Sequence, residues 1–320
     1  MKKTALRDTG VEITELAFGT SGLGDMPETY GYSVDIQRAH ATIRAIFDGP
    51  ANVIDSSRNY GFGRSEERIG NVIRERGGLP EGFVISTKLD RDMDTSQFDP
   101  SRARQSLDES LTVLGVDKVG LLHLHDPEHA RDLGEITGSG GAIAELFKMK
   151  EEGLAQSVGL AMGRLDMMLP ILKEFPFDAI INHNRFTLLN RSANEVFDYA
   201  QGTGMAIINA APFASGVLAK GSAKSRLIAY TEASDDELEP VRSIESICAE
   251  HNIPLAAAAL QFSMRDPRIA STLLGVTKPE RVAETIRLAE VSIPQSVWES
   301  LLALPYSAED PEANRDYRLG

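Results

Sequence analysis

Val119-Gly120-Leu121-Leu122-His123-Leu124-His125 is an apolar run that is typical of a buried strand and ends in an imidazole. Two further runs have the same form: Asn52-Val53-Ile54-Asp55 ends in a carboxylate, and Phe83-Val84-Ile85-Ser86-Thr87-Lys88 ends in an ammonium group. Strands that are apolar throughout are typical of parallel sheets, which are covered on both faces. In a parallel barrel, the carboxyl ends of the strands carry the active-site residues. The three runs therefore predict a parallel barrel with ionisable groups at one end.

The same pattern continues along the whole chain. Strand-like runs alternate with longer helical stretches, which predicts parallel strands joined by right-handed crossovers. Eight such strands indicate an α/β fold, a closed (β/α)8 TIM barrel forming a single domain over residues 1–320. The expected strands are Leu16–Gly19, Val53–Ser56, Val84–Lys88, Val119–His125, Gln156–Leu160, Ala179–Asn182, Ala206–Ala211 and Thr272–Gly275. The expected helices include Asp35–Asp48, Ser65–Arg76, Pro100–Leu114, Gly141–Glu151, Ala193–Gly202, Pro240–His251 and Pro279–Leu288.

An open Rossmann-type sheet is the competing fold. Gly19-Thr20-Ser21-Gly22-Leu23-Gly24 has the glycines of a dinucleotide fingerprint, but Asp25-Met26-Pro27 follows instead of an apolar helix start. Glycines outside a strand–turn–helix context are a weak signal, so the barrel is preferred.

Several segments are expected to lie outside the barrel core. Leu6–Thr14 is typical of a short hairpin before the first barrel strand. Asp126–Gly141 is interpreted as a mobile connection, and Lys220–Glu239 as a long loop near a nucleotide. The charged tail after Pro305 is expected to fold over the barrel mouth.

Composition narrows the class of protein. The chain has 320 residues, of which 42% are hydrophobic, so it can bury a large core. Its 33 basic and 47 acidic residues give a formal charge of −14, which argues against nucleic-acid or anionic-membrane partners. Cys248 is the single cysteine, which excludes an intrachain disulfide and favours a small buried residue over a nucleophile. With neither a signal-peptide core nor a run of about 18 apolar residues, we expect a cytoplasmic protein without a membrane span.

Tyr60 lies five residues after Asp55 and is a candidate general acid or base. A free phenol has a pKa of about 10, so it needs a neighbouring cation to act near neutral pH. Lys88 supplies a cation, and Asp55 can hold it in a buried ion pair. Simpler interpretations are Tyr60 as a packing residue and the Asp–Lys pair as a salt bridge at the barrel rim. The combination with a histidine favours acid–base chemistry on a carbonyl or alcohol.

Two histidines compete for the fourth catalytic position. His123 and His125 alternate with leucines, so both project to the same side of the strand. His125 is nearer the carboxyl end, where a barrel binds substrate, and His123 is expected inside the barrel. A His-x-His pair can bind zinc, but no further ligand pattern accompanies it, so no metal is predicted. The candidate catalytic residues are therefore Asp55, Tyr60, Lys88 and His125.

Five segments, in order and at matching spacing, give the chain a resemblance to the aldo-keto reductase superfamily over nearly its whole length. They are the span from Asp55 through Tyr60-Gly61 to Ser65-Glu66-Glu67-Arg68-Ile69-Gly70, then 85–88, 122–128, 211–218 and 275–284. The resemblance implies a nicotinamide cofactor bound without a Rossmann fold, and hydride transfer to or from a carbonyl carbon. It also implies that Tyr60 donates the proton in reduction or accepts it in oxidation. Lys88 would lower the pKa of Tyr60, Asp55 would hold Lys88, and His125 would orient the substrate oxygen.

The resemblance further implies which residues line the cofactor. Ser86-Thr87-Lys88 would lie under the nicotinamide, and Arg281 and Glu284 would line the adenosine end. The full expected set is Gly19, Thr20, Asp55, His183, Pro212, Phe213, Gly216, Leu218, Gly275, Lys278, Arg281 and Glu284. Because Gly275 stands where many NADP-dependent relatives carry Lys, NAD is favoured over NADP, although Lys278 and Arg281 could hold a 2′-phosphate.

Three positions depart from the family pattern. Ala161-Met162 stands where a Ser-Asn pair commonly holds the carboxamide, and His183 stands at the position of a Gln. Ala210 falls where an aromatic residue usually stacks on the nicotinamide, with Phe213 three residues on. These departures, with Arg185-Phe186-Thr187-Leu188-Leu189, are similar to a bacterial branch that includes D-threo-aldose 1-dehydrogenase, L-fucose dehydrogenase and pyridoxal 4-dehydrogenase. This branch implies an aldose oxidised at C1 to the lactone, or a related aldehyde, as substrate.

Two other functions remain open on the sequence. Lys88 at a barrel strand end could form an imine in a Schiff-base lyase, although an adjacent Asp55 would keep it charged. A nucleotide-sensing regulatory subunit with little turnover is the second alternative, and the intact catalytic set weighs against it.

Overall fold

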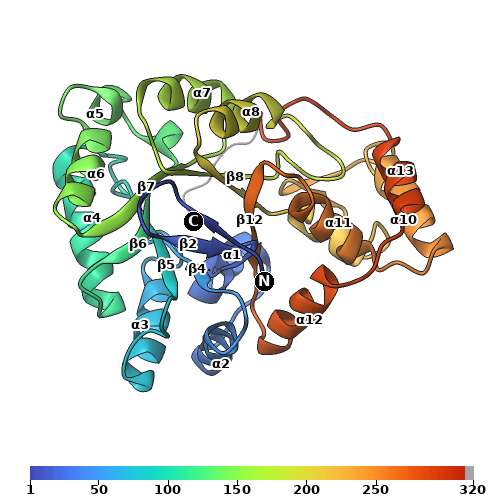
Figure 1. The fold of residues 1–320 in the computed structure, drawn as a ribbon, viewed down its shortest axis with the longest axis horizontal. Coiled ribbons are helices and arrows are strands. Elements are labelled where there is room, and N and C mark those ends of the chain that lie inside the picture. Colours follow the sequence, from blue (N-terminus) through green and yellow to red (C-terminus); the bar gives the residue numbers. More distant parts are fainter. Residues whose placement is uncertain (314–320) are drawn as a thin grey trace.

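Eight parallel strands close a barrel at the centre of the computed structural model, which describes residues 1–313 (Figure 1). The strand order is β12-β3-β4-β5-β6-β7-β8-β9, so each strand pairs with its neighbours in sequence and the last returns to the first. The strands are β3 (Leu16–Gly19), β4 (Val53–Asp55), β5 (Val84–Leu89), β6 (Val119–His125), β7 (Ala155–Ala161), β8 (Ala179–His183), β9 (Ala206–Ala210) and β12 (Ile269–Gly275). The predicted (β/α)8 TIM barrel is confirmed, while the single-domain division over residues 1–320 stays a prediction.

Helices surround the barrel on its outer face (Figure 1). Those that follow the barrel strands are α2 (Ile36–Phe47), α3 (Arg64–Arg76), α4 (Pro100–Leu114), α6 (Ala142–Glu151), α7 (Leu165–Glu174), α8 (Asn194–Gly202), α11 (Leu255–Met264) and α12 (Pro279–Ala289). Further helices are α1 (Pro27–Tyr30), α5 (Gly134–Thr137), α9 (Val217–Lys220), α10 (Glu239–Glu250) and α13 (Gln295–Leu302), with 3-10 turns η1 (Ser21–Gly24), η2 (Pro127–His129) and η3 (Ala214–Gly216). Asp35 and Asp99 cap α2 and α4, because each carboxylate accepts a hydrogen bond from the backbone N–H three residues on. Among the described residues, none of the helices combines the length and the hydrophobicity that a transmembrane span requires.

Alternation along the strands decides which side chains face the barrel interior. Val53 belongs to the apolar cluster inside the barrel, whereas Ile54 packs in the cluster between barrel and helices. Because side chains alternate with a period of two, Asp55 then faces the interior at the carboxyl end of β4. The same alternation turns Lys88 inward, two positions from the inward-facing Ser86.

A hairpin closes the amino end of the barrel (Figure 1). Its strands are β1 (Lys3–Ala5) and β2 (Glu12–Thr14), and Leu6, Val11 and Ile13 are buried with the interior residues of the barrel. The predicted hairpin is therefore present, but it begins at Lys3, and Leu6 lies in the connection rather than in a strand. With the amino end closed, the carboxyl end is the mouth.

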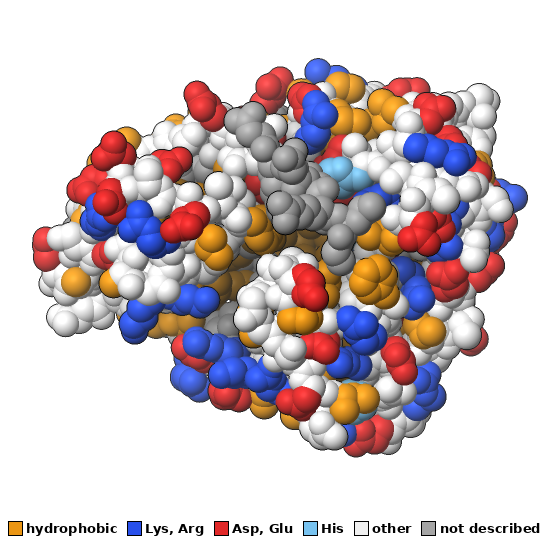
Figure 2. Space-filling view, turned by 180° about the vertical axis from the view of Figure 1, so that it is seen from behind, with side chains coloured by type: hydrophobic (Ala, Val, Ile, Leu, Met, Phe, Trp, Pro, Cys, Tyr) orange, Lys and Arg blue, Asp and Glu red, His pale blue; other side chains and the backbone are white. Residues whose placement is uncertain are grey.

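The long connections at the mouth contain more regular structure than the sequence predicted. Residues 126–141 include η2 and α5, and residues 220–239 include the small hairpin β10 (Leu227–Ile228) and β11 (Thr231–Glu232). The tail returns to the mouth as expected, since Ser307 pairs with Asn190 after β8. The part of this prediction that concerns residues 314–320 lies outside the described residues. From behind the view of Figure 1, charged side chains of both signs are spread over the face, and hydrophobic side chains gather toward its centre (Figure 2).

Candidate active site

The ends of β4 and β5 place Asp55 and Lys88 in direct contact. The strands pair in register, so that Asp55 lies opposite Ser86, two positions before Lys88. The Lys88 Nζ lies 2.7 Å from Asp55 Oδ1 and also contacts Oδ2 and the carbonyl oxygen of Ser56, the last at 2.7 Å. Both side chains are almost fully buried, at 2% and 3% exposure. The ammonium group has three N–H donors, and these three acceptors use all of them.

Tyr60 is held beside this pair by a close contact between two backbone segments. A Cβ atom built on Gly61 would lie 1.9 Å from the carbonyl oxygen of Gly24, and Gly61 has φ +64°, so only glycine fits there. The ring of Tyr60 lies 4.8 Å from Lys88 Nζ, measured to the ring centroid. It also makes an edge-to-face contact with His125 at a centroid distance of 5.9 Å. The four predicted catalytic residues therefore meet at the mouth.

The pKa of Tyr60 is raised well above its usual value, first by burial and then by the negative charge of Asp55. The pKa of Tyr60 is thus raised overall, where the resemblance implied a lowering by Lys88. The physical reason is that Asp55, at 2.7 Å, offsets the charge of Lys88, while the buried site disfavours a phenolate. Burial likewise raises the pKa of Asp55, against the opposing effect of Lys88. Tyr60 is thus a protonated phenol, the form that can donate a proton.

Asp90, which sequence reasoning missed, contacts His125. Its Oδ1 lies 2.6 Å from His125 Nδ1, and its Oδ2 accepts hydrogen bonds from Ser57 Oγ at 2.6 Å and from the Asn59 N–H at 3.1 Å. Burial opposes ionisation of Asp90, yet His125 holds the pKa of Asp90 below its usual value. A signal was available in the sequence, because Asp90 follows Lys88 by two residues, directly after β5 ends at Leu89, and so continues the alternation that turns Lys88 inward.

His125 itself is charged more readily than a free histidine. Burial on its own would lower the pKa of His125, but Asp126 and Asp90 together raise it above the usual value. The Oδ2 of Asp126 lies 3.6 Å from His125 Nε2, the ring nitrogen that Asp90 leaves free. His125 therefore offers Nε2 for contact with a substrate oxygen.

His123 lies inside the barrel, as expected. It is fully buried, its Nδ1 lies 3.4 Å from Ser86 Oγ, and burial holds its pKa well below the usual value. Gly159 of β7 makes room for the ring, since a Cβ there would lie 2.4 Å from His123 Cδ2. Among the described residues, no group of three or more His, Cys, Asp or Glu side chains could hold a metal ion. The predicted absence of a metal is not tested by this arrangement.

Some of the residues expected near the nicotinamide face the mouth, and others make structural contacts within the barrel. Thr20, next to Gly19 at the end of β3, donates from Oγ1 to the carbonyl oxygen of Asp55 at 2.8 Å and so supports the strand ends. Thr87 points away from the interior and donates to Glu66 at 2.6 Å. Of the predicted Ser86-Thr87-Lys88 surface, only the first and third residues therefore face the mouth.

His183 ends β8 and contacts the C-terminal segment. Its Nε2 lies 3.1 Å from Glu312 Oε1, which also accepts from Asn184 Nδ2 at 3.0 Å and from Arg185 Nη1 at 3.2 Å. Burial opposes ionisation of Glu312, but His183 and Arg185 hold its pKa well below the usual value. His183, which the family resemblance assigned to the cofactor, thus also holds the C-terminal segment at the mouth. Glu312 of that segment is 127 residues away in sequence from its partner Arg185.

The segment after β9 carries further predicted cofactor residues. Pro212 and Phe213 lie between Ala211 and Ala214, whose φ angles are +55° and +46°. Phe213 is half-buried against the core, and Leu218 is fully buried, so both also pack structurally. The left-handed φ angles extend to Gly216, at +95°, which leads into α9. Such a run of left-handed backbone is costly and concentrates at functional sites.

The start of α12 provides small and cationic residues at the mouth. A Cβ atom built on Gly275 meets nothing within 4 Å, so there is open space at the end of β12. Lys278 precedes the helix, and Arg281 in its first turn pairs with Glu284 at 2.8 Å. Together with the small Ala210 at the end of β9, these residues are compatible with a dinucleotide, whose phosphates favour cations and helix N-termini.

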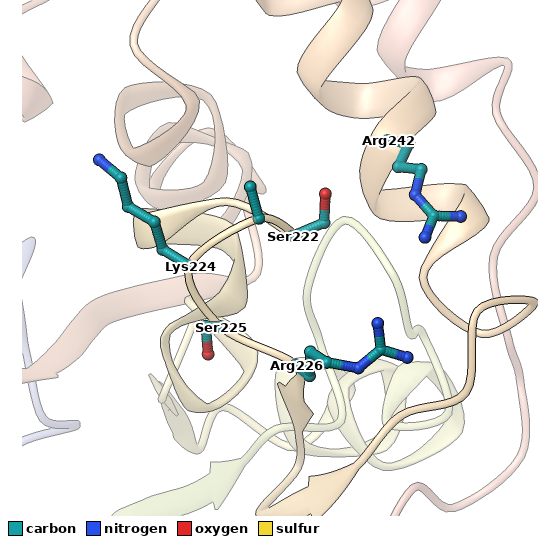
Figure 3. A pocket seen from close by; sticks show the side chains of 6 residues that line it. Ser222, Lys224, Ser225, Arg226 and Arg242 are labelled. Atoms are coloured by element: carbon teal, nitrogen blue, oxygen red, sulfur yellow. The ribbon is translucent and has the colours of Figure 1, made fainter.

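Two cavities lie outside the catalytic cluster. One of about 470 Å³ is lined by residues 222–226 and Arg242, with the guanidinium groups of Arg226 and Arg242 turned toward one another and Lys224 pointing away (Figure 3). The other, of about 650 Å³, lies between Asn184, the β10–β11 hairpin and the C-terminal segment near Asp310. In the described part of the chain, neither of these two cavities is lined by a candidate catalytic residue.

Comparison with known proteins adds three findings. The Aldo/keto reductase family matches residues 15–304. Pyridoxal 4-dehydrogenase of Microbacterium luteolum is 30% identical across 94% of this chain and 96% of that protein, and D-threo-aldose 1-dehydrogenase of a Pseudomonas species is 28% identical across 91% and 94%. The solved structure of aldo-keto reductase AKR11C1 from Bacillus halodurans, in its holo form, covers 99% of this chain and 100% of its own, with a TM-score of 0.78 and 18% identity. At that identity the structural likeness shows the fold alone.

Proposed function

The chain belongs to the aldo/keto reductase family and is a nicotinamide-dependent oxidoreductase, and from this premise we propose that it oxidises an aldose at C1 to the lactone, or a related aldehyde, with NAD. The observation that supports the chemistry is the buried Asp55–Lys88 pair beside Tyr60 and His125. The substrate class is supported by the two dehydrogenases at 30% and 28% identity, whose names specify pyridoxal and D-threo-aldose.

The proposed roles follow from the state of each side chain. The bound nicotinamide supplies or accepts the hydride. Tyr60, a protonated phenol beside the Lys88 ammonium, donates the proton to the substrate oxygen in reduction, and in oxidation its phenolate accepts the proton of the substrate hydroxyl. His125 donates from Nε2 to the same oxygen and so orients it, while Asp55 holds Lys88 in place.

A Schiff-base lyase is disfavoured by the contacts of Lys88. An imine requires a neutral amine with a free lone pair. The Nζ of Lys88 instead contacts both oxygens of Asp55 and the carbonyl oxygen of Ser56, an arrangement that favours the ammonium form. A regulatory subunit without turnover would have no need of four acid–base groups in mutual contact.

NAD is proposed over NADP on the basis of charge at the start of α12. The guanidinium group of Arg281 is paired with the carboxylate of Glu284, which would repel a 2′-phosphate. Gly275 offers no side chain to such a phosphate. Lys278, the other cation expected at the start of α12, remains for the pyrophosphate, which NAD and NADP have in common.

Titration with NADH and with NADPH, followed by emission of the reduced nicotinamide, tests the proposal. We expect NADH to bind more tightly, and a screen of aldoses and aldehydes with NAD to give turnover. Binding of neither cofactor would contradict the proposal, and tighter binding of NADPH would reverse the cofactor assignment. The cytoplasmic location and the absence of a metal stay predictions.

A further inference from the structure

The contact between Asp90 and His125 fixes which ring nitrogen carries a proton. A carboxylate only accepts hydrogen bonds, so the distance of 2.6 Å from Asp90 Oδ1 to His125 Nδ1 requires a proton on Nδ1. The donors Ser57 Oγ and Asn59 N–H hold the other carboxylate oxygen, so Asp90 cannot rotate away from the ring. A neutral ring held in this way has no proton on Nε2 and can only accept a hydrogen bond there. Donation from Nε2 to a substrate oxygen then requires the imidazolium.

We propose that Asp90 is a positioning residue that fixes this orientation of His125 and keeps its imidazole doubly protonated at neutral pH. The proposal rests on the proposed function, since it concerns how His125 comes to donate to the substrate oxygen. It adds a fifth residue to the site, one that is buried and touches His125 and not the reacting atoms.

Both Asp126 and Asp90 raise the pKa of His125, and Asp90 is the one in direct hydrogen-bond contact with the ring. Asp126 is farther away, with its Oδ2 3.6 Å from Nε2, and its side chain is 27% exposed, so solvent weakens its effect. The Lys88 ammonium opposes a charge on His125, and the Asp55 carboxylate in contact with that ammonium carries the opposite charge. Asp90, at 2% exposure, remains the closest and most deeply buried anion. The titratable or charged side chains that face His125 are Asp90, Asp126, Lys88, Asp55, Tyr60 and His123.

Replacing Asp90 by Asn reverses the proton pattern of the ring. The Asn59 N–H and the Ser57 hydroxyl point at Oδ2 of Asp90, so the single amide oxygen of Asn turns toward them. The amide NH₂ then faces His125 Nδ1, which must accept a hydrogen bond, and the proton moves to Nε2. The variant ring is neutral with a proton on Nε2. It can still donate to a substrate oxygen, but without the positive charge.

Nitrogen-15 NMR of histidine-labelled protein reads this state without any need for turnover. In the wild type, the His125 signals, assigned by their loss in His125→Asn, should show both nitrogens protonated at pH 7. In Asp90→Asn they should show a neutral ring with a proton on Nε2 only. Asp92→Asn is the matched control, because Asp92 lies on the same loop and caps exposed backbone at Thr95. Asp126→Asn separates the effect of the second carboxylate.

The pH profile of turnover provides the second readout. In the wild type, kcat should fall as pH rises through the raised pKa of His125, because Nε2 loses its proton. In Asp90→Asn, kcat at low pH should be about tenfold lower, since a neutral donor makes a weaker hydrogen bond, and this high-pH fall should disappear. Asp92→Asn should retain the wild-type profile.

The outcomes separate the two proposals. A doubly protonated His125 in the wild type that becomes neutral in Asp90→Asn supports the role of Asp90. A neutral His125 at pH 7 in the wild type, or an unchanged ring in Asp90→Asn, overturns it, and a change confined to Asp126→Asn assigns the charge to Asp126 instead. Lack of cofactor binding or of turnover in the wild type would overturn the proposed function, while the NMR result on Asp90 would stand independently.

Discussion

The two halves of the barrel mouth are built in different ways. The ends of β4, β5 and β6 carry Asp55, Lys88 and His125, and each of these side chains is held by a buried partner. The ends of β7, β8 and β9 carry Ala161, His183 and Ala210, of which only His183 is polar. Its partner, Glu312, arrives from the end of the described chain.

This difference separates the half of the mouth that carries the catalytic residues from the half that we expect to contribute to binding. The first half is formed by consecutive strands whose register places the reacting groups, so its geometry depends on the barrel itself. The second half depends on distant segments and on left-handed backbone at Ala211 and Ala214. Loops of this kind vary more readily than the strands that carry them. We therefore expect changes in the first half to alter kcat and changes in the second half to alter binding and local stability.

The largest effect is expected for Tyr60→Phe, which removes only the phenolic proton from the first half. We expect kcat to fall by about 10² to 10⁴, the usual contribution of a general acid or base, with the dissociation constant of NADH nearly unchanged. Steady-state kinetics and a cofactor titration on the same preparation measure both. Near wild-type turnover would remove Tyr60 from its role.

Lys88→Met should affect both stability and turnover, because it leaves the buried Asp55 without its cation. The expected loss is about 3–5 kcal/mol in the free energy of unfolding, measured by denaturant titration. Adding Asp55→Asn should recover much of the stability but none of the activity. Lys150→Met is the control, since it breaks a 2.6 Å contact with Asp178 at the amino end of the barrel and should leave kcat unchanged. Equal kcat values for Lys88→Met and the wild type would contradict the claim that the first half of the mouth carries the chemistry.

Glu312→Gln tests the second half through stability and its pH dependence. Because the pKa of Glu312 is lowered in the folded protein, its carboxylate stabilises the fold above the unfolded value of about 4.5, and this contribution is lost as pH falls below it. We expect the variant to be less stable by about 1–3 kcal/mol at pH 7, with a smaller difference in acid. Glu309→Gln, on the exposed part of the same segment, should show no such difference. A difference in the free energy of unfolding that stays constant at all pH values would mean that the charge of Glu312 is not its cause.

The smallest effect is expected at the start of α12. Glu284→Gln removes the carboxylate that pairs with Arg281, so the guanidinium group becomes available to a 2′-phosphate. We expect affinity for NADPH relative to NADH to rise by less than about tenfold, in line with the small energies of exposed ion pairs. Glu290→Gln, at the other end of the helix, is the control. An unchanged ratio of the NADPH and NADH affinities would mean that the 2′ position of the bound cofactor does not lie beside Arg281.

The sequence predicted the first half of the mouth well, for a physical reason. A strand that ends in an ionisable residue reveals both its direction and the face of that residue, so the sequence alone was enough to place Asp55, Lys88 and His125 together. Asp90 was missed because it follows the apolar Leu89 and resembles an ordinary loop residue, although its spacing of two from Lys88 held the information.

The second half could not be predicted from local patterns. The contact between Glu312 and His183 joins residues that no periodicity relates, and the left-handed φ of Ala211 occurs at a residue type that rarely adopts it. The raised pKa of Tyr60 also depends on three-dimensional geometry, because its first cause is burial and its second is the nearby negative charge of Asp55.

The most direct test of the account is to follow the hydrogen on C1 of the substrate. An aldose carrying deuterium at C1 is incubated with the protein and NAD, and the reduced nicotinamide is examined by mass spectrometry. Direct hydride transfer at this mouth predicts that the deuterium appears in the nicotinamide and that Tyr60→Phe greatly slows its appearance. Oxidised sugar without deuterium in the cofactor would contradict the account.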